Sequence, residues 1–185
     1  VLIVVTMIAA AVLADVIAPY DPVVNDFGRI HLAPSLENWL GTDQFGRDIL
    51  SRIIYGARTA LFVGFACAFV GATTGLVLGV ASAYFGGYFD LLFQRVMDVF
   101  MAFPLIILAL ALVALFGGKI ENDLVLVIIA ITIPFVPRCA RVVRSNALAI
   151  REIPYVDAAR ALGYSHSRII LRHMVPNVMA PFLIM

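Results

Sequence analysis

The chain has 185 residues, of which 63% are hydrophobic and only 14% are charged, whereas soluble domains average about 45–50% and about 25%. The net charge of +1 gives no general case for a nucleic-acid partner. Residues 59–89 carry no charged side chain, and a soluble core of this size cannot bury so long an apolar run. The composition predicts an integral membrane protein surrounded by lipid. It excludes most cytosolic enzymes, secreted disulfide scaffolds and disordered proteins.

The apolar segments predict an all-α fold, a polytopic bundle of membrane helices, because about 20 helical residues cross a bilayer core. Pro19 ends the first segment, while Pro104 and Pro134 are expected to kink two later ones. Since the chain begins and stops inside apolar runs, we expect a fragment, although residues 1–14 also fit the core of a signal peptide. Five spans are expected, at residues 1–18, 59–85, 99–118, 124 to beyond Arg141, and 174 onward, where the fifth is cut short.

The distribution of arginine predicts how these spans are oriented. The positive-inside rule places the arginine-rich loop between the fourth and fifth spans in the cytoplasm. Alternation then makes residues 19–57 an extracytoplasmic loop and leaves residues 58–185 as the main transmembrane domain. The seven arginines of the cytoplasmic segment are Arg138, Arg141, Arg144, Arg151, Arg160, Arg168 and Arg172.

The extracytoplasmic loop is rich in polar turn residues and holds the single tryptophan, Trp39. Asp48 is expected to cap a helix that begins at Ile49. Two roles fit the loop: a folded cover over the mouth of a pore, or a contact surface for a binding protein.

Small residues recur along the second span. Gly71, Gly75 and Gly79 lie four residues apart, and this spacing lets two helix backbones approach closely in lipid. Helix packing within one subunit and packing against another subunit both fit the pattern.

The sequence contains no recognisable catalytic or metal-binding motif. The only lysine, Lys119, lacks the glycine spacing of a Walker A phosphate loop, and Ile120 follows it where a hydroxyl is required. The three histidines are not paired at metal-ligand spacing. Cys67 and Cys139 lie in apolar segments, as expected for buried thiols that form no disulfide. We therefore expect no catalytic residue, no metal and no cofactor bound by this chain, and energy for active transport has to come from another subunit.

The cytoplasmic loop over residues 152–167 carries the most informative pattern. Pro154 suits the first turn of a helix, where its missing N–H costs nothing, and Gly163 is placed to end that helix. Ser165 or Ser167 can cap a second helix. Periodicity leaves three roles open: docking on a partner protein, lying on the lipid surface, or binding DNA as a helix-turn-helix. The attachment of both loop ends to membrane spans argues against DNA.

The run Asp157-Ala158-Ala159, with Gly163 and then Pro176 further on, resembles the EAA loop of bacterial ABC-importer permeases, with Asp157 in place of the usual Glu. Two stretches of the outer loop sharpen the resemblance: Pro19-Tyr-Asp-Pro22, and Leu40-Gly-Thr-Asp-Gln-Phe-Gly-Arg-Asp48. Together they are similar to the second permease subunit of the dipeptide, oligopeptide and nickel importers, along the whole chain.

The resemblance implies an ABC type-1 importer fold of six spans in a bacterial inner membrane, with the EAA loop between the fourth and fifth. It implies a homologous second permease, two cytoplasmic ATPase subunits that use ATP, and an extracytoplasmic solute-binding protein as partners. The loop would be the coupling helix that docks on the ATPase. The residues carried over to this contact are Glu152, Tyr155, Asp157, Ala158, Ala159, Leu162, Gly163 and Ser165.

The expected function is therefore half of an ATP-driven import pore, with dipeptides or oligopeptides as cargo and no substrate-binding residue assigned. Nickel is the alternative cargo, although the sequence shows no histidine and carboxylate cluster that suits it. A passive channel or secondary carrier, in which the loop only rests on lipid, remains an alternative function. A membrane-embedded assembly factor that transports nothing is another.

Overall fold

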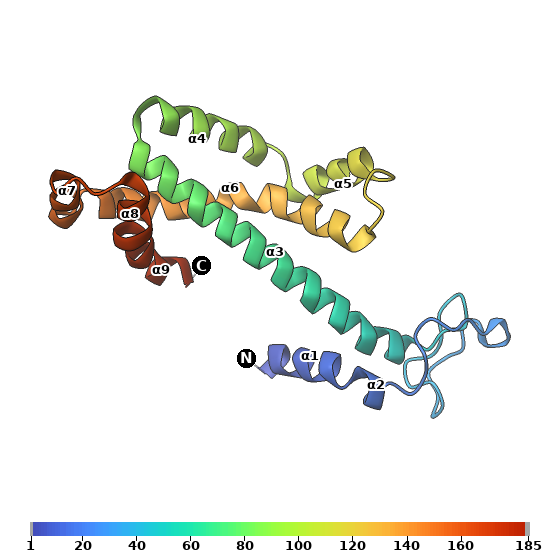
Figure 1. Cartoon of the computed structure of the whole chain (residues 1–185). Coiled ribbons are helices and arrows are strands. Elements are labelled where there is room, and N and C mark those ends of the chain that lie inside the picture. Colours follow the sequence, from blue (N-terminus) through green and yellow to red (C-terminus); the bar gives the residue numbers. More distant parts are fainter. Residues whose placement is uncertain (1, 184–185) are drawn as a thin grey trace. The chain divides into compact units, whose positions relative to one another are not determined.

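The computed structural model describes residues 2–183, and all the regular secondary structure within this range is helical, as the sequence predicts (Figure 1). The chain divides into two compact units, Val1–Phe65 and Ala66–Met185. The elements are α1 (Leu2–Val12), α2 (Ala14–Ile17), the short 3-10 helix η1 (Phe27–Arg29), α3 (Ile49–Phe85), α4 (Gly87–Met101), α5 (Leu105–Phe116), α6 (Asp123–Arg151), α7 (Pro154–Ala161), α8 (His166–Ile169), the π-helical turn η2 (Ile170–Met174) and α9 (Val175–Leu183).

Two helices, α3 and α6, are long and apolar enough to cross a membrane, and α4 with α5 would make a third span as a bent pair. The expected single helix over residues 99–118 is thus replaced by two helices at an angle of 90°. Pro104 lies at the break. It lacks an N–H and disfavours a helical conformation in the residue before it, so a break forms where we expected a kink. By contrast, α6 runs through Pro134 and Pro137 as one helix.

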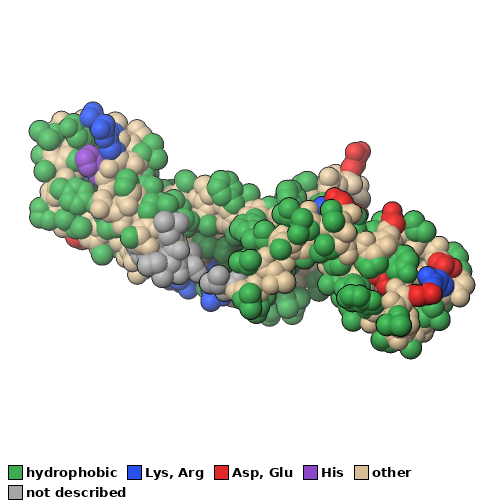
Figure 2. Space-filling view, turned by 90° about the horizontal axis from the view of Figure 1, so that it is seen from below, with side chains coloured by type: hydrophobic (Ala, Val, Ile, Leu, Met, Phe, Trp, Pro, Cys, Tyr) green, Lys and Arg blue, Asp and Glu red, His purple; other side chains and the backbone are tan. Residues whose placement is uncertain are grey.

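Hydrophobic side chains cover most of the face shown in Figure 2, as expected for helices that meet lipid, while acidic side chains gather over the loop between α2 and α3. α1 is also apolar, but it is only 11 residues long and ends at Val12, so the first expected span is interrupted before Pro19.

In the first unit, Asp48 starts α3 ten residues before the expected span. The backbone N–H of Ser51 donates to Asp48 Oδ2 at 2.7 Å, which confirms the predicted cap. Asn38 Nδ2 donates to the other carboxylate oxygen at 2.9 Å. Both side chains are buried, so the outer loop is fastened to the beginning of the helix.

Asp43 organises the remainder of this loop. Its Oδ1 accepts backbone N–H groups from Phe45 at 2.8 Å and from Arg47 at 3.0 Å. Its Oδ2 accepts Arg47 Nε at 2.9 Å and also pairs with Arg52. Burial acts to raise the pKa of Asp43, but the hydrogen bonds from Arg47 and Phe45 outweigh burial and hold that pKa well below its usual value.

Arg58 ties the first apolar segment to α3 within the same unit. Its Nη2 lies 2.8 Å from Asp15 Oδ2, and its Nε donates to the carbonyl of Ala11 near the end of α1. Tyr55, one turn earlier, donates its hydroxyl to Asp15 at 3.0 Å. These contacts satisfy polar groups at the interruption between α1 and α2.

In the second unit, α3 and α6 approach closely through the predicted glycine stripe. A Cβ built on Gly75 would lie 2.5 Å from Cys139 Cβ, and one on Gly79 would lie 2.5 Å from the carbonyl oxygen of Ala140. Gly71 faces Phe135 at the same distance. Cys139 is therefore buried between the helices. Both cysteines are buried and unbridged, as predicted.

Ion pairs join α4 to α6. Asp90 pairs with Arg144 and accepts the Ser82 hydroxyl of α3 at 2.5 Å, and Asp98 pairs with Arg141 at 2.5 Å. Two of the arginines that set the predicted orientation thus hold a neighbouring helix.

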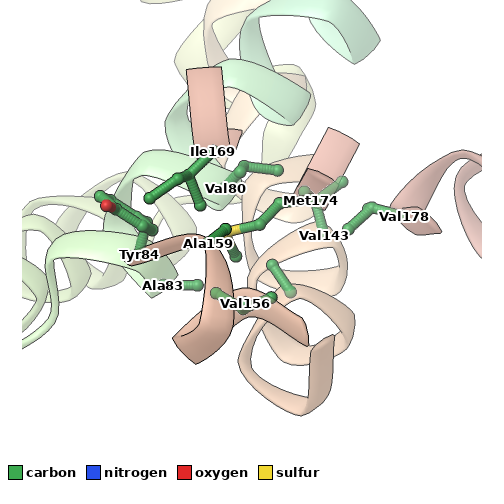
Figure 3. Packing of buried hydrophobic residues seen from close by; sticks show 10 residues of the cluster. Val80, Ala83, Tyr84, Val143, Val156, Ala159, Ile169, Met174 and Val178 are labelled. Carbon is green, nitrogen blue, oxygen red and sulfur yellow. The ribbon is translucent and has the colours of Figure 1, made fainter. Parts of the chain in front are cut away.

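The core of the second unit lies where α3, α6, α7, α8 and α9 meet (Figure 3). Val80 of α3, Val143 of α6 and Val156 of α7 are fully buried there and lie in one apolar cluster. Among the described residues, the buried members of the cluster are Val80, Ala83, Tyr84, Val143, Ala147, Val156, Ala159, Ile169, Met174 and Val178.

We predict that Gly79→Val lowers the free energy of unfolding by about 1–3 kcal/mol, the usual cost of overpacking, because the new side chain meets the α6 backbone. Denaturant unfolding of the detergent-solubilised protein measures the change. Gly64→Val is the matched control, since a Cβ on Gly64 has no neighbour within 4 Å. Equal effects of the two substitutions would contradict the packing described here.

The lowered pKa of Asp43 predicts that the outer loop loosens in acid. A carboxylate whose folded-state pKa lies below its unfolded value of about 3.9 contributes stability above that value and loses it as the pH falls through the folded pKa. Asp43→Asn should therefore raise the mobility of Trp39 at pH 7. Below about pH 4, the mobility of Trp39 should depend less on pH in this variant than in the wild type. Fluorescence anisotropy of Trp39 measures this, with Asp123→Asn as a control outside the loop. An unchanged anisotropy profile in Asp43→Asn would refute the assignment.

Candidate coupling surface

The segment 152–167 forms the predicted helix, turn and helix. Pro154 occupies the start of α7, and the helix ends at Ala161. Gly163 has a φ angle of +74°, the left-handed conformation expected from its place after the helix. The N–H of Tyr164 donates to the carbonyl of Ala159 at 3.2 Å, which closes the turn.

The predicted side-chain cap of the second helix is absent. Ser165 stands before α8, but its hydroxyl makes no capping hydrogen bond and lies 3.3 Å from the hydroxyl of Ser167. Only the backbone carbonyl of Ser165 takes part, accepting the N–H of Ile169 at 3.0 Å. The second helix then continues through η2 into α9. Pro176 has no N–H to donate to the preceding turn, which accounts for the widened π-helical stretch before it.

α7 has one buried face and one exposed face. Val156 is 0% exposed and Ala159 is 4% exposed, and both lie in the core beside α3 and α6 (Figure 3). Ala158 lies on the outer face, and Leu162 is 71% exposed. Of the eight residues expected to contact an ATPase, seven are exposed: Glu152, Tyr155, Asp157, Ala158, Leu162, Gly163 and Ser165.

Two residues of the predicted set, Ala159 and Tyr155, also make contacts within the protein. Ala159 points inward, so it holds the helix on the bundle while its neighbour Ala158 faces out. Tyr155 is exposed, but its hydroxyl donates to the backbone carbonyl of His173 at 3.1 Å and accepts Asn177 Nδ2 at 3.0 Å. Tyr155 therefore connects α7 to the beginning of α9.

Charges on the exposed face are largely neutralised locally. Asp157 pairs with Arg160 one turn later at 3.0 Å, and Glu152 pairs with Arg151 at 2.9 Å. Exposed pairs of this kind contribute about 0–1 kcal/mol. The outer face thus offers small and apolar groups, Ala158 and Leu162, framed by paired charges, which suits a groove on a protein partner.

Sequence reasoning missed the contacts that anchor this loop to α3. Arg151, at the end of α6, donates its Nη1 to the carbonyl of Ala83 at 2.8 Å. That carbonyl belongs to the last turn of α3, where backbone acceptors lack partners within the helix. An arginine counted only as a marker of the cytoplasmic side therefore also fixes a helix end.

Within residues 2–183, no group of three or more His, Cys, Asp and Glu side chains is placed to hold a metal ion. What the segment offers is a rigid, exposed helix on a closely packed base.

Comparison with known proteins identifies the family. Residues 75–185 match the family described as binding-protein-dependent transport system inner membrane component. A protein of Brucella suis biovar 1 (strain 1330), named for a peptide transport system permease, is 43% identical over 178 residues, which cover 96% of this chain and 58% of that protein. The glutathione transport system permease protein GsiD of Escherichia coli O157:H7 is 41% identical over 184 residues, covering 99% of this chain and 59% of that protein.

The chain thus spans about three-fifths of the length of the curated relatives it matches. The region that matches the family includes α7 and the exposed turn after it, and so does the alignment with the Brucella suis protein, which covers nearly all of this chain. The chain therefore belongs to the binding-protein-dependent transport system inner membrane components, the ABC permeases of the peptide import family.

Proposed function

We propose that this chain is part of the membrane-spanning permease of an ATP-driven importer, and that α7 is the segment through which a separate ATPase drives it. The observation that carries this proposal is the two-sided character of α7. Its inner face shares one core with α3 and α6, while its outer face is exposed. A force applied to the outer face is therefore passed to the spanning helices.

The arginine distribution supports a cytoplasmic position for α7, on the side where ATP is available. We propose the bacterial inner membrane as the location, in keeping with the family description. Two ATPase subunits, a homologous second permease and an extracytoplasmic solute-binding protein complete the proposed assembly. ATP is bound and hydrolysed in the ATPase partner, and this chain supplies half of the pore.

The proposed cargo is a dipeptide or oligopeptide. The support comes from relatives named for peptide and for glutathione transport, since glutathione is itself a peptide. The solute-binding protein is expected to make most of the selection, because it meets the solute first.

The proposed mechanism is a switch between two packed arrangements of the helices. Closure of the ATPase dimer displaces α7, and the buried side chain of Val156 prevents α7 from moving alone. Withdrawing Val156 from the core would cost about 1.5–3 kcal/mol, so α3 and α6 follow as a unit. Close packing at Gly75 and Gly79 keeps those two helices together during the movement.

We predict that Gly163→Val uncouples ATP hydrolysis from uptake. The φ angle of +74° strains a β-branched residue by about 1–2 kcal/mol, and no steric clash adds to this because a Cβ there has no neighbour within 4 Å. Peptide uptake into proteoliposomes holding the complete transporter should fall on the order of tenfold, with normal membrane insertion.

The matched control is Gly163→Asn, because asparagine tolerates the left-handed conformation. It should retain most uptake. Gly87→Val tests whether backbone strain alone lowers uptake. Gly87 also has a positive φ angle and open space around it, but it lies outside α7. Unchanged uptake in Gly163→Val, or uptake by the wild type that persists without ATP, would contradict the proposed coupling.

A further inference from the structure

Tyr84 of α3 touches both sides of the turn that follows α7. It is the penultimate residue of α3 and is 7% exposed. Its hydroxyl oxygen is hydrogen-bonded to Nδ1 of His166 at 2.7 Å, and the two rings meet edge to face at 5.5 Å between centroids. The guanidinium of Arg160 lies over the Tyr84 ring, 5.2 Å from its centroid.

These two partners come from different helices. Arg160 belongs to α7, and His166 is the first residue of α8, so the turn that contains Gly163 lies between them. Tyr84, on a spanning helix, thus contacts both α7 and α8, the two helices on either side of the turn.

We propose that Tyr84 is a positioning residue, through which displacement of α7 and α8 is delivered to the end of α3. The inference rests on the proposed function, because it names the contact by which ATP-driven movement of the loop reaches the bundle. Figure 3 shows Tyr84 in the same cluster as Val156 and Ala159, so polar and apolar attachments act at one place.

The hydrogen bond between Tyr84 and His166 depends on orientation, whereas the apolar contacts do not. Apolar burial is non-directional, so Val156 and Ala159 resist withdrawal of α7 from the core but depend less on the orientation of the loop. A hydrogen bond depends steeply on angle and distance, and a cation over an aromatic face also fixes a position. Tyr84 therefore helps to set the register between the loop and α3, together with the hydrogen bond from Arg151 to the carbonyl of Ala83.

The contacts around the end of α3 determine which helices a displacement at Tyr84 reaches. The preceding carbonyl, of Ala83, is held by Arg151 of α6. After Phe85 the chain turns at Gly86, with a φ angle of +62°, and α4 begins at Gly87, with a φ angle of +55°. A displacement at Tyr84 therefore acts on α3 and α6, which pack closely through Gly79. It also reaches α4, because Asp90 accepts the Ser82 hydroxyl of the same last turns of α3.

The test is Tyr84→Phe in the full-length permease assembled with its partner subunits in proteoliposomes. The substitution keeps the ring, its burial and the contact with Arg160, and it removes only the hydroxyl. We expect the ratio of ATP hydrolysed to peptide transported to rise roughly 2- to 10-fold, as for loss of one hydrogen bond. Assembly and basal ATP hydrolysis should be unchanged.

Three further variants separate positioning from stability. His166→Ala should raise the ratio at least as much, because it removes the same bond and also the ring contact with Tyr84. The double variant Tyr84→Phe/His166→Ala should be no worse than His166→Ala alone, because the bond is already lost. His166→Asn should restore the normal ratio, since an amide group can replace Nδ1 as a partner of the hydroxyl. Tyr88→Phe is the matched control, because Tyr88 is 92% exposed.

The outcomes distinguish this inference from the function on which it rests. A wild-type assembly without ATP-dependent uptake overturns the proposed function and the inference together. A wild type that is ATP-driven, with an unchanged ratio in Tyr84→Phe, overturns the inference alone. A parallel loss of uptake and hydrolysis, with the ratio unchanged, shows a merely structural role and also overturns it.

Discussion

The shared core of α3, α6 and α7 is the constraint on which the rest of the second unit depends. Val156 and Ala159 fill it from the loop side, and Val80 and Val143 fill it from the spanning helices. Because protein interiors pack densely, such a core moves between discrete arrangements and does not deform gradually. The glycine stripe serves the same end, since Gly75 and Gly79 bring the α3 backbone against α6. The loop is consequently an extension of the bundle.

Local chemistry made a large part of this structure predictable. Pro154 and Gly163 defined α7 because each residue restricts or permits particular backbone angles, and neighbouring atoms have little influence on either effect. Asp48 predicted the start of α3 for the same reason, since a cap acts within one turn. The motif around Asp157 led to the family, which the comparison with known proteins confirmed.

The features that the sequence could not predict depend on partners distant along the chain. The inward orientation of Ala159 and the outward one of Ala158 follow from where α7 docks, and two adjacent alanines carry no sign of it. The pairing of Arg144 with Asp90, and of Tyr84 with His166, joins residues whose proximity only the tertiary fold creates. Pro104 was recognised as a disturbance, but whether a proline kinks or breaks a span is decided by the packing around it.

Cysteine crosslinking tests the central claim, that the outer face of α7 receives the ATPase, most directly. Cys67 and Cys139 are first replaced by alanine, and a single cysteine is then placed at Ala158 or at Ala159 in the assembled transporter. Because Ala158 is exposed and Ala159 is buried, a bifunctional maleimide should join the ATPase to the cysteine at position 158 and leave the one at 159 unreacted. If neither position crosslinks while a cysteine in place of Glu121, just before the opposite end of α6, does so, the account of α7 as the coupling helix is contradicted.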